Sequence, residues 1–584
     1  MFPKRLLPLL PYLKKYRSSY FWGGLCVLVM NSAWALIPPI IGKAIDDMRK
    51  AGISMHKIGM LALLLLAISG TKAIFQFLIR WILIGVSRDI EFDLRNDLFL
   101  HLEKLSHSFY QRTRTGDIMA RATNDLNAVR MLLGPGFMYT ANTVVFTAIA
   151  LGFMMHISYR LTFYAFLPLP VVSIIIQYFG RQIHERFERI QAMFSEISAR
   201  AQENFSGVRI IRAYVQEEAE ISGFEVANRE YISRSLTLVR LMGMLWPTLE
   251  TMLGLAIVLV LWLGGREVIY GRISVGDFTA FNTFMVQLTW PVIALGWVIN
   301  IFQRGTASLV RINELMLQQP EISDSPKLVA KDLAQDVQGE IEFRNLNFAY
   351  DGVPVLRDIS LRIPSGTSLA IVGPTGAGKT TLVSLIPRIY DAEPGSVLID
   401  GRPIREYPLA MLRRNIGFVP QETFLFSETI RENIAFGVQD AGEEDVRWAA
   451  QAANIANEIE DFPEGYKTLV GERGITLSGG QKQRTAIARA LIRNPRILIL
   501  DDALSSVDTQ TEDKILNHLR SVMSGRTTIF ISHRVSTVRN ADRIAVLHGG
   551  RIVELGTHEE LLQRNGYYFD LYNKQLLEEE LAEV

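Results

Sequence analysis

Hydrophobic and polar positions divide this chain of 584 residues into two unlike halves. In the first half, six mostly apolar segments are long enough to cross a bilayer as helices. They cover residues 20–42, 58–86, 134–156, 161–180, 241–265 and 278–302. Inside lipid every backbone polar group needs an internal hydrogen-bond partner, so such segments form helices. The pattern therefore predicts an all-α transmembrane domain with six spans in residues 1–317.

The links that join these spans alternate in length. Links after the first, third and fifth spans are short, whereas residues 87–133 and 181–240 form long, arginine-rich loops with a helical pattern. Lysine and arginine accumulate on the cytoplasmic side of membrane proteins. We therefore expect both long loops and both termini to lie in the cytoplasm.

Three ionisable residues fall inside the predicted spans, where charges are costly and often functional. Lys72 and Arg80 lie in the second span, and Glu250 lies in the fifth. One interpretation is an intramembrane polar site that contacts cargo. The simpler alternative, which the sequence alone favours, is an ion pair or long side chains that reach water.

Composition limits the remaining possibilities. Hydrophobic residues make up 49% of the chain although 21% is charged, which fits one very apolar domain joined to an ordinary globular one. The net charge of +1 gives no indication of a nucleic-acid partner. A single cysteine, Cys26, excludes an intramolecular disulfide and a cysteine-based metal cluster.

Residues 318–337 are polar and contain prolines, so they read as a linker. Beyond it, GEIEFRNLNFAY and ISLRIPSGTSLAIVG resemble strands, and KTTLVSLIPRIY resembles a helix. Alternating strands and helices indicate an α/β domain in residues 338–584.

The run GPTGAGKTT follows the apolar strand SLAIV and opens that helix, which is the context of a phosphate-binding loop. Its backbone N–H groups form an anion site, Lys379 adds a positive charge, and the Thr380 hydroxyl is suited to Mg²⁺. Asp501, at the end of the apolar run ILIL, is suited to the same metal. The residues of the loop are Gly373, Pro374, Thr375, Gly376, Ala377, Gly378, Lys379, Thr380 and Thr381.

Together with the run LSGGQ, these motifs resemble those of ATP-binding cassette (ABC) transporters, and the resemblance covers essentially the whole chain. Six spans before one nucleotide-binding domain resemble an exporter half-transporter of the multidrug and lipid exporter type. The resemblance implies a transport ATPase that uses ATP and Mg²⁺ to export, or move between leaflets, small amphipathic or hydrophobic substrates by alternating access. It also implies a place in the bacterial inner (cytoplasmic) membrane, in contact with membrane lipid.

The resemblance assigns roles to four further residues. Tyr350 resembles the aromatic residue that stacks on adenine, and Gln421 resembles the glutamine that contacts Mg²⁺ and the attacking water. His533 resembles the catalytic histidine at the γ-phosphate. Asp508 resembles an aspartate at the contact between subunits, and alternatively caps a helix.

LSGGQ resembles the family's signature, which binds the ATP held by a second subunit. Its residues are Leu477, Ser478, Gly479, Gly480 and Gln481, of which Ser478 and Gly480 are expected to meet the γ-phosphate. The signature opens a predicted helix, and a helix N-terminus attracts anions. A dimer with ATP sandwiched between two nucleotide-binding domains is therefore implied. VGERG at 470–474 and the segments around 116–117 and 213–217 resemble the parts that couple the two domains.

One position departs from the family. The family usually has a glutamate general base after the metal-binding aspartate, whereas this chain has Asp502. Aspartate reaches about 1.5 Å less far, and a misplacement of about 1 Å costs on the order of 10²-fold in rate. Slow hydrolysis at this chain's own site is expected. The chain thus resembles the degenerate-site subunit of a heterodimeric bacterial multidrug exporter, with a homodimer as the alternative.

Other functions on the same scaffold stay open. An ATP-gated channel or regulator and an exporter-like importer both share these motifs. A soluble ATPase that acts on DNA or ribosomes is disfavoured by the six spans.

Overall fold

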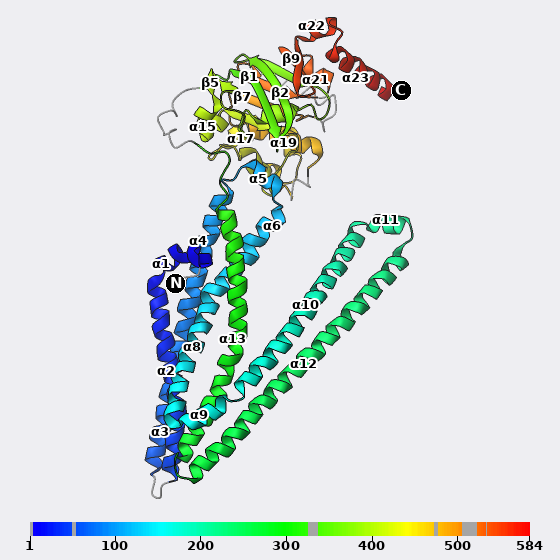
Figure 1. Cartoon of the computed structure of the whole chain (residues 1–584). Helices are drawn as coiled ribbons and strands as arrows, with labels where there is room; N and C mark the ends of the chain where they lie inside the picture. Colours follow the sequence, from blue (N-terminus) through cyan, green and yellow to red (C-terminus); the bar gives the residue numbers. More distant parts are fainter. Residues whose placement is uncertain are drawn as a thin grey trace. The chain divides into compact units, whose positions relative to one another are not determined.

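The computed structural model describes residues 4–49, 54–324, 337–471, 477–504, 515, 523–532 and 534–583. The chain divides into two units (Figure 1). The first contains Met1–His101 and Gly116–Leu317, and the second contains Leu102–Thr115 and Gln318–Val584. The short segment Leu102–Thr115 thus groups with the second unit, although it lies between membrane helices along the chain.

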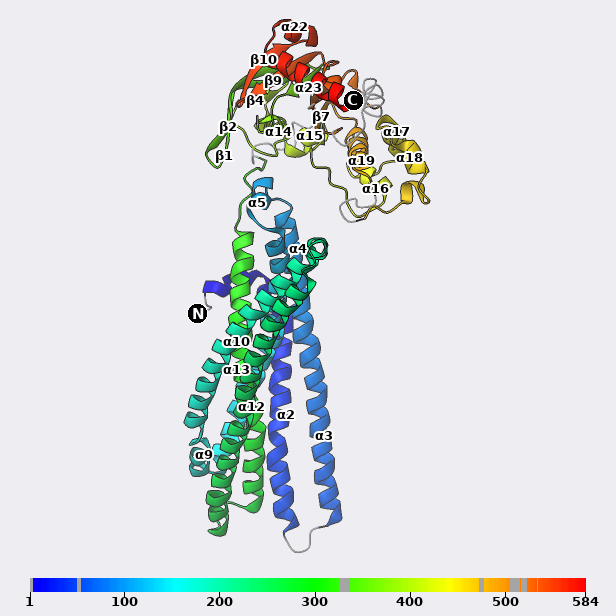
Figure 2. The ribbon, with the colours of Figure 1, turned by 90° about the vertical axis from the view of Figure 1, so that its right-hand side faces the viewer.

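The first unit is helical. Within the described residues, six helices are long and apolar enough to cross a membrane, as the sequence predicts. Figure 2 shows two of them, α2 and α3, side by side, and they pack against each other. The elements of this unit are η1 (Lys4–Leu9), α1 (Leu10–Lys15), α2 (Arg17–Met48), α3 (Met55–Ile79), η2 (Arg80–Ile84), α4 (Gly85–Leu102), α6 (Thr115–Ala120), η3 (Arg121–Asp125), α7 (Leu126–Met131), η4 (Leu132–Gly136), α8 (Phe137–Ile157), α9 (Tyr159–Phe166), α10 (Leu169–Ser206), α11 (Val208–Ala213), α12 (Glu217–Ile269) and α13 (Val275–Met316).

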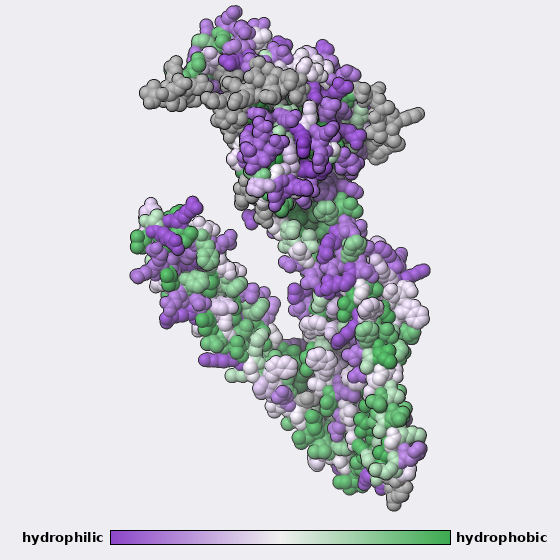
Figure 3. All heavy atoms as spheres, turned by 180° about the vertical axis from the view of Figure 1, so that it is seen from behind, coloured by the Kyte–Doolittle hydropathy of each residue, from purple (hydrophilic) through white to green (hydrophobic). Residues whose placement is uncertain are grey.

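Two of the longest helices, α10 and α12, form an arm. They pack along each other, and Figure 1 shows them leaving α2, α8 and α13 and meeting at the short helix α11. Figure 3 shows hydrophobic residues exposed along this arm among polar ones. Exposed large side chains on it include Phe187, Phe194, Phe205, Ile232 and Trp246. Much of the arm's apolar surface is therefore not buried within the chain itself.

The second unit contains two sheets. The larger has the order β10-β9-β3-β8-β7-β6, and all its neighbouring pairs are parallel except β9 with β10. Its strands are β3 (Ser368–Val372), β6 (Ile416–Val419), β7 (Ile497–Asp501), β8 (Thr527–Ile531), β9 (Arg543–His548) and β10 (Arg551–Gly556). The smaller, antiparallel sheet contains β1 (Ile341–Tyr350), β2 (Val353–Ile363), β4 (Val397–Ile399) and β5 (Arg402–Pro403).

Helices surround the parallel sheet, whose strand β7 is buried along its full length. Burial on both faces explains why its sequence is a continuous apolar run rather than an alternating one. Because the strands are parallel, the carboxyl ends of β3, β8 and β7 share one edge of the sheet. The helices are α5 (His107–Arg112), α14 (Lys379–Ser384), η5 (Ile404–Glu406), α15 (Leu409–Arg414), α16 (Ile430–Ala435), α17 (Glu443–Ala452), α18 (Ala456–Glu460), η6 (Gly465–Lys467), α19 (Gly479–Leu491), α21 (Val535–Val538), α22 (His558–Gln563) and α23 (Tyr567–Glu583).

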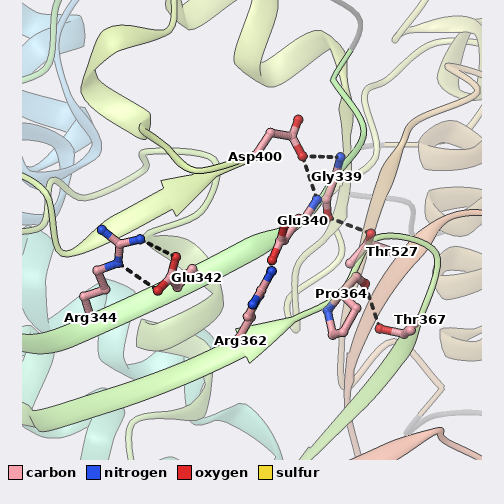
Figure 4. Close-up of polar contacts among 9 residues, drawn as sticks. All are labelled: Gly339, Glu340, Glu342, Arg344, Arg362, Pro364, Thr367, Asp400 and Thr527. Atoms are coloured by element: carbon pink, nitrogen blue, oxygen red, sulfur yellow. Dashed lines mark hydrogen bonds and ion pairs between the residues drawn. The ribbon is translucent and has the colours of Figure 1, made fainter.

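Asp400 holds the start of the smaller sheet in place. Its carboxylate accepts hydrogen bonds from the backbone N–H groups of Gln338, Gly339 and Glu340 at 2.8, 3.0 and 2.9 Å. The Thr527 hydroxyl on β8 donates to the Gly339 carbonyl at 2.6 Å (Figure 4). This small cluster therefore joins the two sheets.

Replacing Asp400 with alanine leaves three backbone donors without their acceptor and should destabilise the second unit by about 1–3 kcal/mol. In a domain of this size each kcal/mol lowers Tm by about 2–4 °C. Asp400→Asn keeps an acceptor and tolerates the left-handed backbone (φ 51°), so its loss should be smaller. Thermal unfolding of the full chain measures this. Arg344→Ala, which removes only a surface ion pair with Glu342, is the matched control, and an equal effect of both changes would contradict the expectation.

Candidate functional site

The phosphate loop connects β3 to α14 at the shared edge of the parallel sheet. Gly373 has φ 147° and Gly378 has φ 98°, and a Cβ atom at Gly373 would lie 2.1 Å from the Leu547 carbonyl oxygen. Glycine is therefore required at both positions. The loop curls around the ammonium group of Lys379, which donates to the carbonyls of Gly373 at 2.8 Å and Pro374 at 3.0 Å.

The positively charged ammonium group of Lys379 is buried. This burial lowers its pKa, whereas the negative charges of Asp501 and Asp502 raise it. Its partners are neutral carbonyl oxygens rather than a carboxylate, so the positive charge is not cancelled by a direct ion pair. A phosphate group that entered the loop would supply the missing negative charge.

Asp501 ends β7 close to the phosphate loop. The Thr380 hydroxyl donates to Asp501 Oδ1 at 3.2 Å. Oδ2 is buried and has no hydrogen-bond partner among the described residues. Burial raises the pKa of the carboxyl group, and the neighbouring Asp502 adds to this shift. A buried carboxylate oxygen without a donor, beside a hydroxyl and a phosphate loop, is the kind of oxygen set that suits Mg²⁺.

Asp502 lies at the turn just after β7. Its backbone N–H donates to the Ile531 carbonyl at 3.0 Å, so the contact with β8 continues one residue beyond the strand. Its φ of 49° is left-handed, a conformation that aspartate tolerates better than most residues. The side chain borders a small hollow that Ser532, Thr537 and Asn540 also line. Asp502 therefore directly follows Asp501, the proposed metal ligand, but its backbone is left-handed, whereas Asp501 belongs to strand β7.

Tyr350 is the last residue of β1 and belongs to an aromatic cluster. Its ring packs edge-to-face with Phe348 and Tyr390, with ring centroids 4.9 and 5.1 Å away. Its hydroxyl donates to Thr381 Oγ1 at 3.2 Å. This hydrogen bond ties the aromatic side chain to the helix that follows the phosphate loop. Sequence reasoning missed Tyr390, because only the fold brings it to Tyr350.

The segment Leu102–Thr115 reaches the same aromatic cluster. The rings of His107 and Tyr390 meet edge-to-face at 5.7 Å. Arg112 forms an ion pair with Asp351, the residue after Tyr350, and lies 3.6 Å from a carboxylate oxygen of Glu321. Arg112 was visible in the sequence only as one of many arginines in a long loop. This contact is one of those by which the segment Leu102–Thr115 groups with the second unit.

The signature residues form a helix cap. Ser478 is the N-cap of α19, its hydroxyl accepts from the Gln481 N–H at 3.3 Å, and the Gln481 side chain accepts from the Ser478 N–H at 2.9 Å. This is the reciprocal arrangement of a capping box. Leu477 is buried, whereas Ser478 and Gly479 are exposed. The motif therefore fixes the helix start and presents its N-terminus at the surface.

Two arginines on α19 connect the helix that the signature begins to neighbouring segments, and neither was identified from the sequence. Arg484 donates to the Asn454 carbonyl at 2.8 Å and pairs with Glu458, which also accepts from the Gln481 side chain at 3.0 Å. Arg489 donates to the carbonyls of Phe424 and Asn433, both at 2.8 Å. Burial lowers the pKa of Arg489 to about 10. These contacts connect α19 to the segment that follows β6.

The remaining expected residues are more scattered. Gln421 is exposed two residues beyond the end of β6, the strand that neighbours β7. Val470 and Gly471 of VGERG are described, whereas residues 472–474, Asp508 and His533 lie outside the described residues. In the first unit, Lys72 and Arg80 line one cavity. Glu250, exposed on α12, does not line it.

Comparisons with known proteins extend over both units. Residues 20–292 match the family model of the ABC transporter transmembrane region, and residues 356–505 match that of the ABC transporter. The probable multidrug resistance ABC transporter ATP-binding/permease protein YheI of Bacillus subtilis (strain 168) is 39% identical over 573 residues, 97% of each chain. An ATP-dependent lipid A-core flippase of Syntrophus aciditrophicus (strain SB) is 38% identical, over 99% of this chain and 95% of the relative. A solved bacterial Atm1-family ABC exporter with ATP bound has a TM-score of 0.78 at 31% identity, over 96% of this chain and 98% of that one.

Changing Asp501 to asparagine should stabilise the chain at neutral pH when nucleotide and Mg²⁺ are absent. A raised pKa means that the fold disfavours the charged carboxylate, so this charge destabilises the chain at a pH above the folded pKa. That cost fades as the pH falls toward the ordinary value of 3.8, and the gain from the substitution should shrink with it. Asparagine still accepts from Thr380.

Thermal unfolding between pH 8 and about pH 5 tests this pH dependence. With ATP present, Asp501→Asn should also lose the additional stabilisation that Mg²⁺ gives the wild type. Asp440→Asn, at an exposed aspartate, is the control and should change neither quantity. A less stable Asp501→Asn variant at pH 8, or an unchanged Mg²⁺ effect, would count against the assignment.

Proposed function

This chain belongs to the ABC transporters as an exporter-type half-transporter, an ATPase coupled to transport, and from that premise we propose what it moves and how it assembles. It exports amphipathic or hydrophobic molecules across the cytoplasmic membrane, or moves them between leaflets, by alternating access. The observation that carries the proposal is the phosphate loop beside Asp501, in a chain whose other unit has, among its described residues, six helices able to span a membrane. We further propose that both termini lie in the cytoplasm.

The proposed roles at the ATP site follow the geometry of the loop. Tyr350 stacks on adenine, and the loop amides and Lys379 hold the phosphates. Thr380, Asp501 and Gln421 hold Mg²⁺, which when bound neutralises charge on the phosphates. Asp502 and His533 act on the attacking water and the γ-phosphate, with Gln421 orienting the water. Asp508 contacts the second subunit.

We propose that the working protein is a dimer. The exposed start of α19 supports this, because a helix N-terminus at the surface is suited to an anion brought by another molecule. The arm of α10 and α12 supports it independently, because its exposed apolar side chains extend beyond one bilayer thickness. A helix of 53 residues such as α12 is about 80 Å long, whereas a bilayer core is about 30 Å thick. A second half-transporter would cover part of this surface.

A heterodimer is favoured over a homodimer because of Asp502. A partner with glutamate at the corresponding position would supply one efficient site, which this chain's complete signature would serve. This chain's own phosphate loop would then bind ATP and hydrolyse it slowly. Coupling to the membrane unit would pass through the Leu102–Thr115 segment, since Arg112 contacts the residue next to Tyr350.

ATP-driven transport should be measurable in proteoliposomes that contain the complete transporter. We expect uptake of a fluorescent amphiphile against its gradient when ATP and Mg²⁺ are outside. Lys379→Ala should abolish uptake, because the phosphates lose their buried positive charge. Passive, gradient-following flux that ATP only switches on would support an ATP-gated channel. Net movement of the amphiphile in the opposite direction would support an importer.

The heterodimer proposal predicts weak ATPase activity from this chain alone. Asp502→Glu should raise the turnover of the purified chain by about 10²-fold, because the longer side chain restores the reach of the general base. ATP binding must be measured alongside, since glutamate fits a φ of 49° less well than aspartate. Adding Lys379→Ala to Asp502→Glu should remove the gain. Robust turnover by the lone wild-type chain, unchanged by Asp502→Glu, would refute a slow native site.

A further inference from the structure

We propose that the cavity between α2, α3, α8 and α13 binds the headgroup of an amphiphile that carries a negative charge and at least one hydroxyl group. The inference rests on the proposed export of amphipathic molecules and names their chemical class. It depends on three features of the cavity, which are its unpaired cations, a buried acceptor without a donor, and its aromatic wall.

Two cationic side chains face the cavity from the same continuous helix, about two helical turns apart. Lys72 lies on α3, and Arg80 begins the π-helical segment η2. Neither forms an ion pair with any carboxylate in the described parts of the chain, so the interpretation of these charges as members of an ion pair finds no support there. Unbalanced positive charge at membrane depth is costly unless a ligand neutralises it. The cavity therefore selects against cationic cargo.

The Lys72 ammonium is positioned rather than free to swing toward water. Its Nζ lies 4.7 Å from the centroid of the Trp34 ring, and that ring stacks on Phe146 at 4.0 Å. A cation–π contact holds the charge on the cavity side of the helix. π-Helical turns, such as the one that starts at Arg80, occur frequently at functional sites. Both features point to a site built for a ligand.

Asn31 supplies the complementary polar group. Its side chain is fully buried, and its Nδ2 donates to the Val27 carbonyl at 2.8 Å and to Asn142 Oδ1 at 3.1 Å. Its Oδ1 has no hydrogen-bond partner among the described residues although it borders the cavity. A buried acceptor of this kind needs a donor. A hydroxyl on the ligand meets that need, whereas an anion without one does not.

The rest of the lining is apolar or aromatic and fits the body of an amphiphile. Met30, Met138 and Trp290 contribute to it. The cavity volume is ≈ 240 Å³. Sites that enclose a whole drug-sized ligand measure about 300–1,000 Å³. The cavity therefore holds a headgroup and the first part of a chain, with the remaining tail outside it.

Two lysolipids with the same acyl chain provide the test. Both carry a free hydroxyl on the glycerol backbone, but lysophosphatidylglycerol has a net negative charge, whereas lysophosphatidylcholine is zwitterionic. Binding to the full chain in neutral-lipid nanodiscs is followed by tryptophan fluorescence, which Trp34 and Trp290 in the cavity can report. We expect lysophosphatidylglycerol to bind about tenfold more tightly than lysophosphatidylcholine, the effect of one charge-assisted hydrogen bond.

Variants separate charge recognition from general packing. Lys72→Gln should weaken lysophosphatidylglycerol about tenfold and leave lysophosphatidylcholine nearly unchanged, whereas Lys72→Arg should stay within about threefold of wild type. Arg160→Gln, at an exposed arginine of α9 that does not line the cavity, is the control and should alter neither affinity. Stabilisation by ATP, measured for each variant, shows that the protein is folded. Equal affinities for the two lipids, or an equal loss of both in Lys72→Gln, would overturn the proposal.

A second experiment distinguishes whether the headgroup belongs to a membrane lipid or to a soluble amphiphile. Translocation of fluorescent phosphatidylglycerol in proteoliposomes would identify a membrane lipid, and binding of the free lysolipid alone would identify a soluble amphiphile; both agree with the proposed class. A transporter that pumps a neutral dye with ATP but shows no preference for the anionic lipid would defeat only this inference. Absence of any ATP-driven transport would instead defeat the proposed function.

Discussion

The parallel pairing of β3, β8 and β7 is the constraint on which the ATP site depends. It brings the carboxyl ends of two strands that are more than a hundred positions apart in sequence to one edge of the sheet. Thr380 and Asp501 meet there within hydrogen-bonding distance. A slip of one residue in this register would turn the carboxylate away from the loop, since side chains alternate between the faces of a strand. The register of β7 in the sheet therefore fixes the geometry of the ATP site.

The features that could be predicted from the sequence are those formed by residues close together along the chain. Spans are visible because hydrophobicity persists over a whole helix, and the phosphate loop is visible because its glycines, lysine and flanking strand are contiguous. The signature was recognised as a motif, but its physical role as a capping box, with Ser478 and Gln481 satisfying each other's backbone groups, required the structure. Such short-range rules predicted the six spans and placed the loop between a strand and a helix.

Long-range contacts explain what the sequence could not supply. Arg112 and Asp351 are far apart along the chain, and nothing in either neighbourhood indicates the other. Arg489 reads as an ordinary helix residue until the fold places two backbone carbonyls around it. The cavity that Lys72 lines forms only where four helices pack together. That packing places no carboxylate among the described residues that line it. Charge in a span is therefore readable from sequence, whereas its partner is not.

The exposed arm of α10 and α12 has a consequence for how cells make this protein. A newly inserted chain carries long helices whose apolar faces lack a protein neighbour, and such surfaces attract aggregation and proteolysis. A newly made half-transporter is therefore vulnerable until a second half-transporter, whether a copy of itself or a different chain, covers this surface.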